Sequence, residues 1–233
     1  MDSIPIIYED DRIVVINKPA GLLVHHGDVS SNPNEPTVAA WLVNKYPSIK
    51  GVGEDPARPG IVHRLDRQTS GVLVIAKNQA AYEHLKKQFK NREAVKTYRA
   101  ILEGILKDDR GLIDRPIGKA RADVRLRMAG SRARGVLREA LTYYKVLDRF
   151  ASANCTYAEL YPKTGRTHQI RVHAKAINHP VVGDLVYGAL SRPGVTRHLL
   201  HAYSLEITLP SGERRTFNAP LPPDFLDFLS RVS

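Results

Sequence analysis

Residues 59–76 read PGIVHRLDRQTSGVLVIA, and this stretch decides how the chain is interpreted. Its first half is rich in turn-forming residues and holds one carboxylate, Asp66, between Arg64 and Arg67. Its second half, 72–76, is a short apolar run of the kind expected for a buried strand. Neighbouring cations favour the ionised form of a carboxylate, and a fixed, ionised aspartate can act as a nucleophile or general base. A loop aspartate that only caps a turn, beside solvated arginines, is the other interpretation of these residues.

Short strands and single helices alternate along the rest of the chain. Periodicity and turn residues predict helices at 38–46, from Asn78 to Phe89, at 167–178 and after Pro222, with Thr37 and Asn78 as N-caps. The predicted strands are 13–16, 22–24, 72–76, 96–102, 141–147, 153–161 and a hairpin of 205–209 with 214–218. Because strands often follow strands directly, this order predicts an α+β fold with a mixed, largely antiparallel sheet and flanking helices.

Composition narrows the class of protein. The 233 residues include 35 Lys and Arg against 24 Asp and Glu, a net charge of +11, and the pI is about 9.8. With 42% hydrophobic residues the chain should fold, and its charge favours a polyanionic partner, above all a nucleic acid. A basic enzyme without a nucleic-acid partner is the alternative.

The sequence excludes or disfavours several classes of protein. Cys155, the single cysteine, can form neither an internal disulfide nor a Cys-rich zinc site. The N-terminus lacks the pattern of a signal peptide, and the apolar run at 72–76 is far too short to span a membrane. We therefore expect a cytoplasmic protein without membrane association.

A basic segment covers residues 119–138, which hold seven Lys and Arg residues against Asp123, a net charge of +6. Val124, Leu126 and Met128 alternate with Arg125 and Arg127, the pattern of a strand with one apolar and one cationic face. A turn at 129–131 predicts a two-stranded ribbon suited to phosphate backbones, with Arg125 and Arg127 as RNA contacts. A solvated, self-repelling surface loop is the alternative.

Two further groups could carry chemistry. Residues 96–100, KTYRA, place Tyr98 on a strand, where it could stack on a base or move a proton. Residues 164–173, TGRTHQIRVH, predict a helix on which Thr167, Arg171 and Lys175 share a polar stripe. The plainer interpretations are a packed strand tyrosine and a surface arginine. Metal catalysis is disfavoured because His168 and His173 lie five residues apart, off the spacing of zinc ligands on one helix face.

The three groups, in this order, resemble the RluA family of RNA pseudouridine synthases. The matching stretches are HRLD and TSG within 63–71, K-x-Y-x-A at 96–100 and TGRTHQIR-x-H at 164–173. Supporting similarities are NKPAG at 17–21, HPVVGD at 179–184, Tyr187-Gly188, LHA at 200–202 and F-x-AP at 217–220. The resemblance extends from about Ile6 to Leu229.

The resemblance implies an enzyme that isomerises uridine in RNA by detaching the base at N1, rotating it and rejoining it through C5, without cofactor or metal. It implies that Asp66 is the catalytic aspartate, as nucleophile or base, and that Tyr98 stacks on the target base and assists proton removal. Arg171 would pair with the aspartate and hold it ionised. Arg64 would fill the gap left by the flipped nucleotide, and Leu200 would pack near the base. Arg67 is a further candidate for substrate binding.

Two features depart from many relatives. The catalytic region begins close to Met1, so we expect residues 1–233 to be a single catalytic domain without an N-terminal S4-type RNA-binding domain, and to act as a monomer. Lys163 stands where an apolar residue is common in the family.

The favoured substrate is 23S ribosomal RNA, with tRNA as the alternative. Two functions of other classes stay open. One is a non-catalytic RNA-binding or ribosome-assembly factor. The other is a metal-dependent nucleic-acid hydrolase that uses His168, His173 and Asp184.

Overall fold

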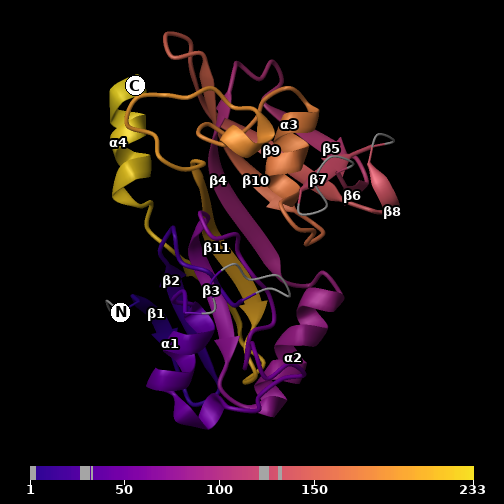
Figure 1. Ribbon diagram of the computed structural model, residues 1–233, viewed down its shortest axis with the longest axis vertical. Helices are drawn as coiled ribbons and strands as arrows, with labels where there is room; N and C mark the ends of the chain where they lie inside the picture. Colours follow the sequence, from indigo (N-terminus) through magenta and orange to yellow (C-terminus); the bar gives the residue numbers. More distant parts are fainter. Residues whose placement is uncertain (1–3, 27–31, 33, 121–125, 131–132) are drawn as a thin grey trace. The chain divides into compact units, whose positions relative to one another are not determined.

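The computed structural model describes residues 4–26, 32, 34–120, 126–130 and 133–233 (Figure 1). The chain forms two compact units, each built from two segments. Unit 1 comprises Met1–Val95 and Ala202–Pro220, and unit 2 comprises Lys96–His201 and Leu221–Ser233. Each unit is described by itself.

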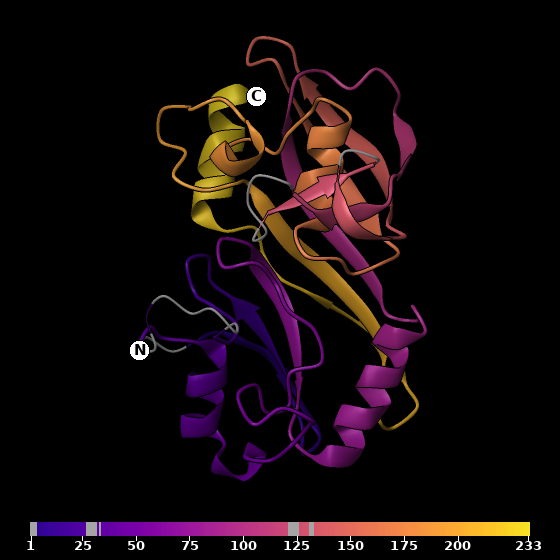
Figure 2. The same cartoon turned by 45° about the vertical axis from the view of Figure 1, so that its right-hand side comes forward.

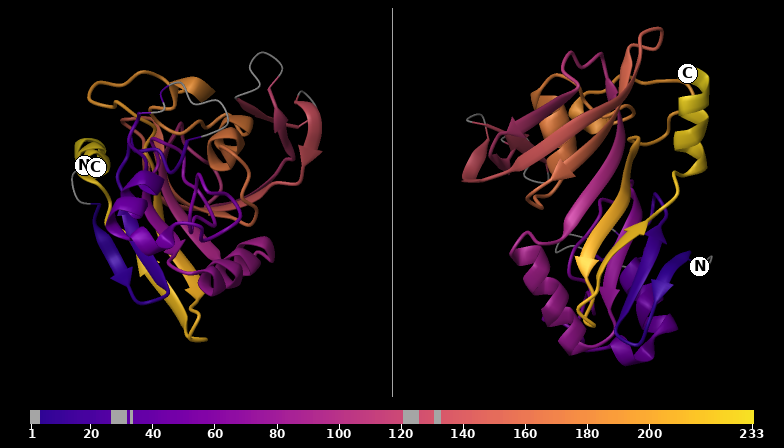
Figure 3. Two further views of the ribbon diagram at one scale, coloured as in Figure 1. Left: turned by 60° about the horizontal axis from the view of Figure 1, so that its bottom comes forward. Right: turned by 180° about the vertical axis from the view of Figure 1, so that it is seen from behind.

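Unit 1 is organised around two strands, β2 (Ile13–Lys18) and β3 (Ser70–Ala76), whose residues are almost all buried. β1 (Ile6–Glu9), β2, β3 and β11 (Leu200–Thr208) follow one another in the sheet, and β12 (Arg214–Asn218) pairs with β11. The β1–β2, β2–β3 and β11–β12 pairs are antiparallel. Every residue of β3 is buried, which explains its continuous apolar sequence. Figure 3 shows β12 returning beside β11 as the predicted hairpin.

The helices of unit 1 begin at the predicted caps. α1 (Val38–Lys45) starts where Thr37 accepts a hydrogen bond from the Ala40 amide at 3.0 Å. α2 (Gln79–Lys90) starts where Asn78 accepts one from the Ala81 amide at 2.9 Å. Each cap satisfies an amide that the first helical turn leaves without a partner. α2 packs on β3, and a 3₁₀ turn, η1 (Pro47–Ile49), follows α1 (Figures 1 and 2).

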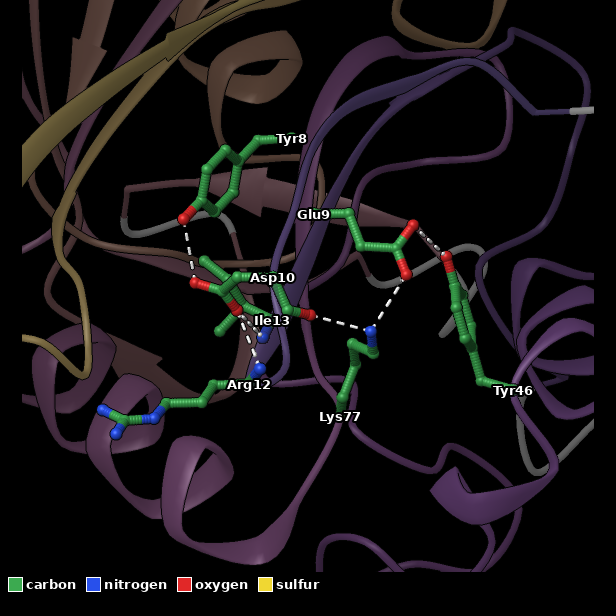
Figure 4. A network of polar contacts seen from close by, with 7 residues as sticks. All are labelled: Tyr8, Glu9, Asp10, Arg12, Ile13, Tyr46 and Lys77. Carbon is green, nitrogen blue, oxygen red and sulfur yellow. Dashed lines mark hydrogen bonds and ion pairs between the residues drawn. The ribbon is translucent and has the colours of Figure 1, made fainter.

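A polar network closes one end of this sheet (Figure 4). Asp10 accepts from the backbone amides of Arg12 and Ile13 at 2.8 and 2.7 Å, which fixes the β1–β2 turn. The Lys77 ammonium, just after β3, donates to Glu9 at 2.9 Å, and the Tyr46 hydroxyl donates to the same carboxylate at 2.8 Å. Burial and this hydrogen bond raise the pKa of Tyr46. The network joins the ends of α1, β1 and β3.

Unit 2 contains the strands β4 (Val95–Glu103), β10 (Cys155–Pro162), β9 (Leu141–Phe150) and β5 (Arg110–Asp114), in that spatial order. Each pair is antiparallel. The helix α3 (Gln169–Ala176) contributes Ile170 and Ala174 to a core with β4 and β10. The helix α4 (Pro223–Val232) contributes Phe225 and Phe228 to a second core (Figure 1).

The basic segment forms a separate three-stranded sheet in unit 2. β6 (Ile117–Lys119) lies between β7 (Arg127–Ala129) and β8 (Arg134–Arg138), and both pairs are antiparallel. The predicted two-stranded ribbon is therefore wrong, because β7 and β8 each pair with β6, one on either edge of that strand. The predicted apolar face is not buried either, since Met128 is 37% exposed. Arg125 lies outside the described residues.

The predicted α+β class with a largely antiparallel sheet is confirmed. Two predicted elements are wrong. Residues 22–24 form no strand beyond an isolated bridge of Leu23 to Thr37. The helix predicted at 167–178 begins only at Gln169, because His168 adopts a left-handed backbone conformation with φ of 57°. In the part of the chain that the structure describes, no helix is long and apolar enough to cross a membrane.

Gly71 supports a close approach of β3 to β11 that no other residue allows. Its φ is +117°, and a Cβ atom there would lie 2.2 Å from the carbonyl oxygen of Ala202. We predict that Gly71→Ala lowers the free energy of unfolding by about 3 kcal/mol or more, from backbone strain and steric overlap together. Urea unfolding followed by circular dichroism measures this.

Gly51→Ala is the matched control for this prediction. Gly51 also has a positive φ, +84°, but a Cβ atom there would meet nothing within 4 Å. Its cost should be limited to about 1 kcal/mol of backbone strain. Equal losses in the two variants would contradict the role given to the Gly71–Ala202 contact.

Candidate active site

Asp66 lies in a tight turn immediately before β3. The Thr69 amide donates to the Asp66 carbonyl at 3.0 Å, and Leu65, Thr69 and Ser70 are all buried. The main chain on both sides of Asp66 is thus fixed, while the Asp66 side chain stays partly exposed. The turn therefore presents one carboxylate from a rigid support, which is what a catalytic carboxylate requires.

A buried lysine holds this turn in place. Lys18, at the end of β2, is 0% exposed, and its ammonium donates to the carbonyls of Pro19, Leu22 and Arg67 at 2.8, 2.8 and 3.0 Å. Charged donors make stronger hydrogen bonds than neutral ones, and here they join the 19–22 segment to the residue after Asp66. The sequence showed Lys18 only as part of a strand-ending turn, so this role was missed.

Arg64 and Arg67, which flank Asp66 in sequence, differ in their surroundings. Both are exposed. Arg67 donates through Nε to the Gly21 carbonyl at 3.0 Å and forms an ion pair with Glu35. Arg67 thus joins Gly21 and Glu35 to the Asp66 turn, which gives it a structural role. Its predicted role in substrate binding, like that of Arg64, stays a prediction.

His63 also serves the structure of unit 1. Its Nε2 accepts a hydrogen bond from the Val74 amide at 3.1 Å, so the neutral ring carries its proton on Nδ1. The ring stacks on Phe89 of α2, with centroids 4.4 Å apart. His63 therefore couples the turn to β3 and α2.

In unit 2, Arg171 of α3 is buried, which corrects the interpretation as a surface arginine. It is 6% exposed and donates through Nε and Nη2 to the two carboxylate oxygens of Asp184, at 2.6 and 2.9 Å. Thr167 precedes the helix, so the predicted stripe of Thr167, Arg171 and Lys175 is not formed. A bidentate pair of this kind fixes the guanidinium plane.

Tyr187 completes this cluster. Its ring lies under the Arg171 guanidinium at 4.9 Å, and its hydroxyl is 2.8 Å from His168 Nδ1 and accepts from the Arg127 amide at 3.1 Å. The tyrosine therefore links α3 to strand β7 of the basic sheet. The sequence named Tyr187 only as a supporting similarity, and Asp184 as a similarity and as a metal-ligand candidate, so their contacts with Arg171 were missed. For Asp184, the signal that could have found this contact is that a buried arginine needs an acidic partner.

Tyr98 and Leu200 belong to one hydrophobic cluster of unit 2. Leu200 is 3% exposed, and Tyr98, which is half-buried, packs against the cluster formed by Leu200, Leu160, Ile170 and other buried residues of β4, β10 and α3. Tyr98 thus packs against this cluster. The predicted roles of Tyr98 and Leu200 at the target base stay predictions.

The segment before α3 is held in place by the side-chain amide of Gln169. Gln169 accepts from the Thr164 hydroxyl at 2.7 Å and from the Arg166 amide at 3.0 Å, and it donates to the Leu141 carbonyl at 3.0 Å. Thr164, Arg166 and Gln169 of the T-G-R-T-H-Q stretch thus shape the loop through these contacts. The motif therefore specifies a backbone conformation as well as a cationic side chain.

The donor set for the metal-dependent alternative is dispersed. His173 Nδ1 is 2.9 Å from the Thr142 hydroxyl and Nε2 is 3.0 Å from the Arg115 carbonyl, while His168 meets Tyr187 and Asp184 meets Arg171. Among the described residues, no group of three or more His, Cys, Asp or Glu side chains is placed to hold a metal ion. The predicted trio of His168, His173 and Asp184 is therefore wrong as a metal site.

The family model of RNA pseudouridylate synthase matches residues 12–176, which include Asp66, Tyr98 and Arg171. The chain belongs to the RNA pseudouridylate synthase family. The predicted resemblance is confirmed.

Known members of the pseudouridylate synthase family match over nearly the whole chain. The Borreliella burgdorferi protein named ribosomal large subunit pseudouridine synthase D is 40% identical over 97% of this chain and 68% of its own length. Its Neisseria meningitidis namesake is 40% identical over 98% of this chain and 61% of its own length. The chain thus spans about two thirds of the length of these relatives. The structure of human RNA pseudouridylate synthase domain containing 1 superposes with a TM-score of 0.76 at 30% identity, covering 99% of this chain and 94% of the human one.

Lys18 provides a test of how the chain supports its Asp66 turn. We predict that Lys18→Met lowers the free energy of unfolding by about 2–4 kcal/mol, because it leaves three part-buried carbonyl oxygens without this cationic donor. Lys50→Met, at an exposed position, is the control and should change stability by less than about 0.5 kcal/mol. Denaturant unfolding measures the stability of both variants. Equal stabilities would contradict the supporting role given to the Lys18 ammonium.

His173 gives the chain a pH-dependent stability. Burial lowers the pKa of His173 below its ordinary 6.5, so the unfolded chain takes up a proton first as the pH falls. Stability from this residue is therefore complete above pH 6.5 and is lost below it, with a slope of up to about 1.4 kcal/mol per pH unit.

His173→Gln isolates this contribution. The pKa of His25 is also lowered by burial, so the wild type and His173→Gln should both lose stability in acid, the variant less steeply. Unfolding free energies measured between pH 5 and pH 8 give both slopes. Parallel slopes would contradict the role of His173.

Proposed function

We propose that this chain is an isomerase that converts uridine to pseudouridine in RNA, and that Asp66 is its catalytic residue. The observation that carries the proposal is the family match over 12–176, which contains Asp66 on its rigid turn. The reaction breaks the bond between ribose C1′ and uracil N1 and forms one between C1′ and C5. The proton on C5 is released, N1 gains one, and no oxidant, reductant or energy source is consumed.

Asp66 suits the central step of this reaction. A carboxylate fixed by the main chain can attack the ribose or the base, or accept a proton, without first losing conformational freedom. The arginine that the resemblance pairs with this aspartate is Arg171, which would favour the ionised carboxylate. This pairing stays a prediction.

Tyr98 and Leu200 are proposed to receive the uracil. A uracil stacked inside RNA cannot be reached, and flipping it out costs a few kcal/mol, which stacking on an aromatic ring can offset. Tyr98 packs against the buried cluster that contains Leu200, which holds its side chain in place. We propose Arg64 as the residue that occupies the vacated position in the RNA.

The basic sheet is proposed to bind the flanking RNA backbone. Arg134 and Arg138 of β8 are exposed, and Arg127 of β7 is tied by its amide to Tyr187. Arginine forms bidentate contacts with phosphate, and such contacts fix position rather than sequence. Arg125 is included in this proposal on its sequence position.

Large-subunit ribosomal RNA is the proposed substrate. Support comes from relatives in Borreliella and Neisseria that are named ribosomal large subunit pseudouridine synthase D. The same chemistry on tRNA is the alternative, and mapping pseudouridine across the transcriptome of a deletion strain separates the two.

Asp66→Asn tests the proposed chemistry. We predict that it reduces tritium release from RNA labelled at uracil C5 by about 10³-fold or more, since it removes the nucleophile or base while preserving shape. Asp11→Asn is the control, because Asp11 is an exposed carboxylate of the same unit. Full activity of the Asp66 variant would overturn the assignment.

The same variant separates catalysis from a role in RNA binding or ribosome assembly alone. In a deletion strain, a binding-only function requires Asp66→Asn to restore the phenotype, whereas an isomerase requires it to fail. Substitution of Arg134 and Arg138 should weaken RNA binding in either case. RNA binding by purified Asp66→Asn shows whether any failure lies in chemistry.

A further inference from the structure

Lys96 is a half-buried lysine in unit 2 that the proposed chemistry does not use. It lies on β4, two residues before Tyr98 and on the same face of the strand. Its ammonium has the Thr164 carbonyl as a hydrogen-bond partner, at the long distance of 3.4 Å. Burial, followed by the charge of Lys163, lowers the pKa of Lys96 to about 8. The ammonium is thus partly removed from water without a strong acceptor.

Lys163 brings a second cation to the same place. It directly precedes Thr164, whose carbonyl faces Lys96, and it is exposed. Its ammonium lies 5.9 Å from the ring centre of Tyr143, which is 41% exposed. The charge of Lys163 is one of the causes of the lowered Lys96 pKa, and two like charges disfavour each other unless an anion lies near both.

No carboxylate compensates this pair in the part of the chain that the structure describes. Neither lysine takes part in a salt bridge there. The space beside the Lys96 ammonium is open, because a Cβ atom at Gly165 would meet only that ammonium within 4 Å, at 4.0 Å. Gly165 thus leaves unfilled a position beside this ammonium.

We infer that Lys96 and Lys163, with the open backbone at Gly165, form a binding site for one phosphodiester group of the RNA substrate. This inference rests on the proposed function, which supplies RNA as the ligand. A phosphate oxygen offers the strong acceptor that the Lys96 ammonium lacks, and its charge relieves the repulsion between the two lysines. The exposed Tyr143 adds an aromatic surface beside the cations, a combination common where proteins bind single-stranded RNA.

The site is distinct from the basic sheet in its chemistry. There, exposed arginines offer several donors to the RNA backbone, whereas here two ammonium groups and a glycine define a position for a single phosphate. A lysine acts on phosphate as a compact point charge. Lys163 should therefore contribute to affinity for any RNA sequence and leave base selection unchanged.

Lys163→Leu tests this inference by RNA binding at several salt concentrations. The probe is large-subunit ribosomal RNA from a strain that lacks this protein. We expect about fivefold weaker binding near 0.1 M salt, and a plot of log affinity against log salt whose slope is smaller in magnitude by about 0.7–0.9, the value for one lost phosphate contact. Lys163→Arg should restore both. Lys107→Leu, which removes an exposed lysine of the same unit, should change neither.

Kinetics keep a structural effect apart from a binding effect. Lys163→Leu should raise KM for tritium release about fivefold and leave kcat unchanged, with an unchanged melting temperature. Lys96→Met should show the same loss of affinity and salt dependence. An unchanged salt slope in both variants would overturn the site. The site would also be overturned if the variants differed from the wild type only in how inorganic phosphate inhibits the reaction.

Failure of this inference is distinguishable from failure of the proposed function. If the wild-type protein releases no tritium from any RNA, the proposed isomerase activity fails. If the wild type is active but Lys163→Leu and Lys107→Leu bind RNA alike, the phosphate site fails while the isomerase stands.

Discussion

The buried ammonium of Lys18 is the constraint on which the candidate site of unit 1 depends. It donates to three carbonyls, one of them from the residue directly after Asp66. A lysine with no exposure is costly unless its charge is well solvated by the protein. Because the turn solvates it, the turn cannot rearrange without leaving a buried charge unpaired. The rigidity of the Asp66 backbone therefore follows from the electrostatics of a residue distant in sequence.

In unit 2 a buried charge is likewise stabilised by hydrogen bonds, here within an ion pair. Arg171 and Asp184 are both buried and joined by two hydrogen bonds, and Tyr187 covers the guanidinium. Breaking either side of such a pair strands a charge, which costs about 3–5 kcal/mol. The cluster thus holds Arg171 in one orientation on α3. In both units, the polar residues beside the candidate catalytic groups are fixed by contacts that have no catalytic purpose of their own.

Local rules predicted much of the fold. The caps Thr37 and Asn78, the apolar run of β3 and the β11–β12 hairpin follow from side chains that act within a few residues of themselves. The strand at 22–24 was wrong because the carbonyl of Leu22 is taken by Lys18 rather than by a neighbouring strand. The two-stranded basic ribbon was wrong because β6, which begins before the segment at Ile117, pairs with both of its strands.

The sequence by itself determined the family, since Asp66, Tyr98 and Arg171 stand in motifs whose order and spacing are specific. The chemical roles of these three residues stay predictions. Only the tertiary structure decided what those motifs rest on: Lys18 under the Asp66 turn, Asp184 and Tyr187 around Arg171, and Gly71 against Ala202. It also brought Lys96 beside the 163–165 loop. The reason is physical. A motif records which side chains are needed, whereas burial and charge pairing arise between segments far apart in sequence, and their energies exist only once those segments are packed.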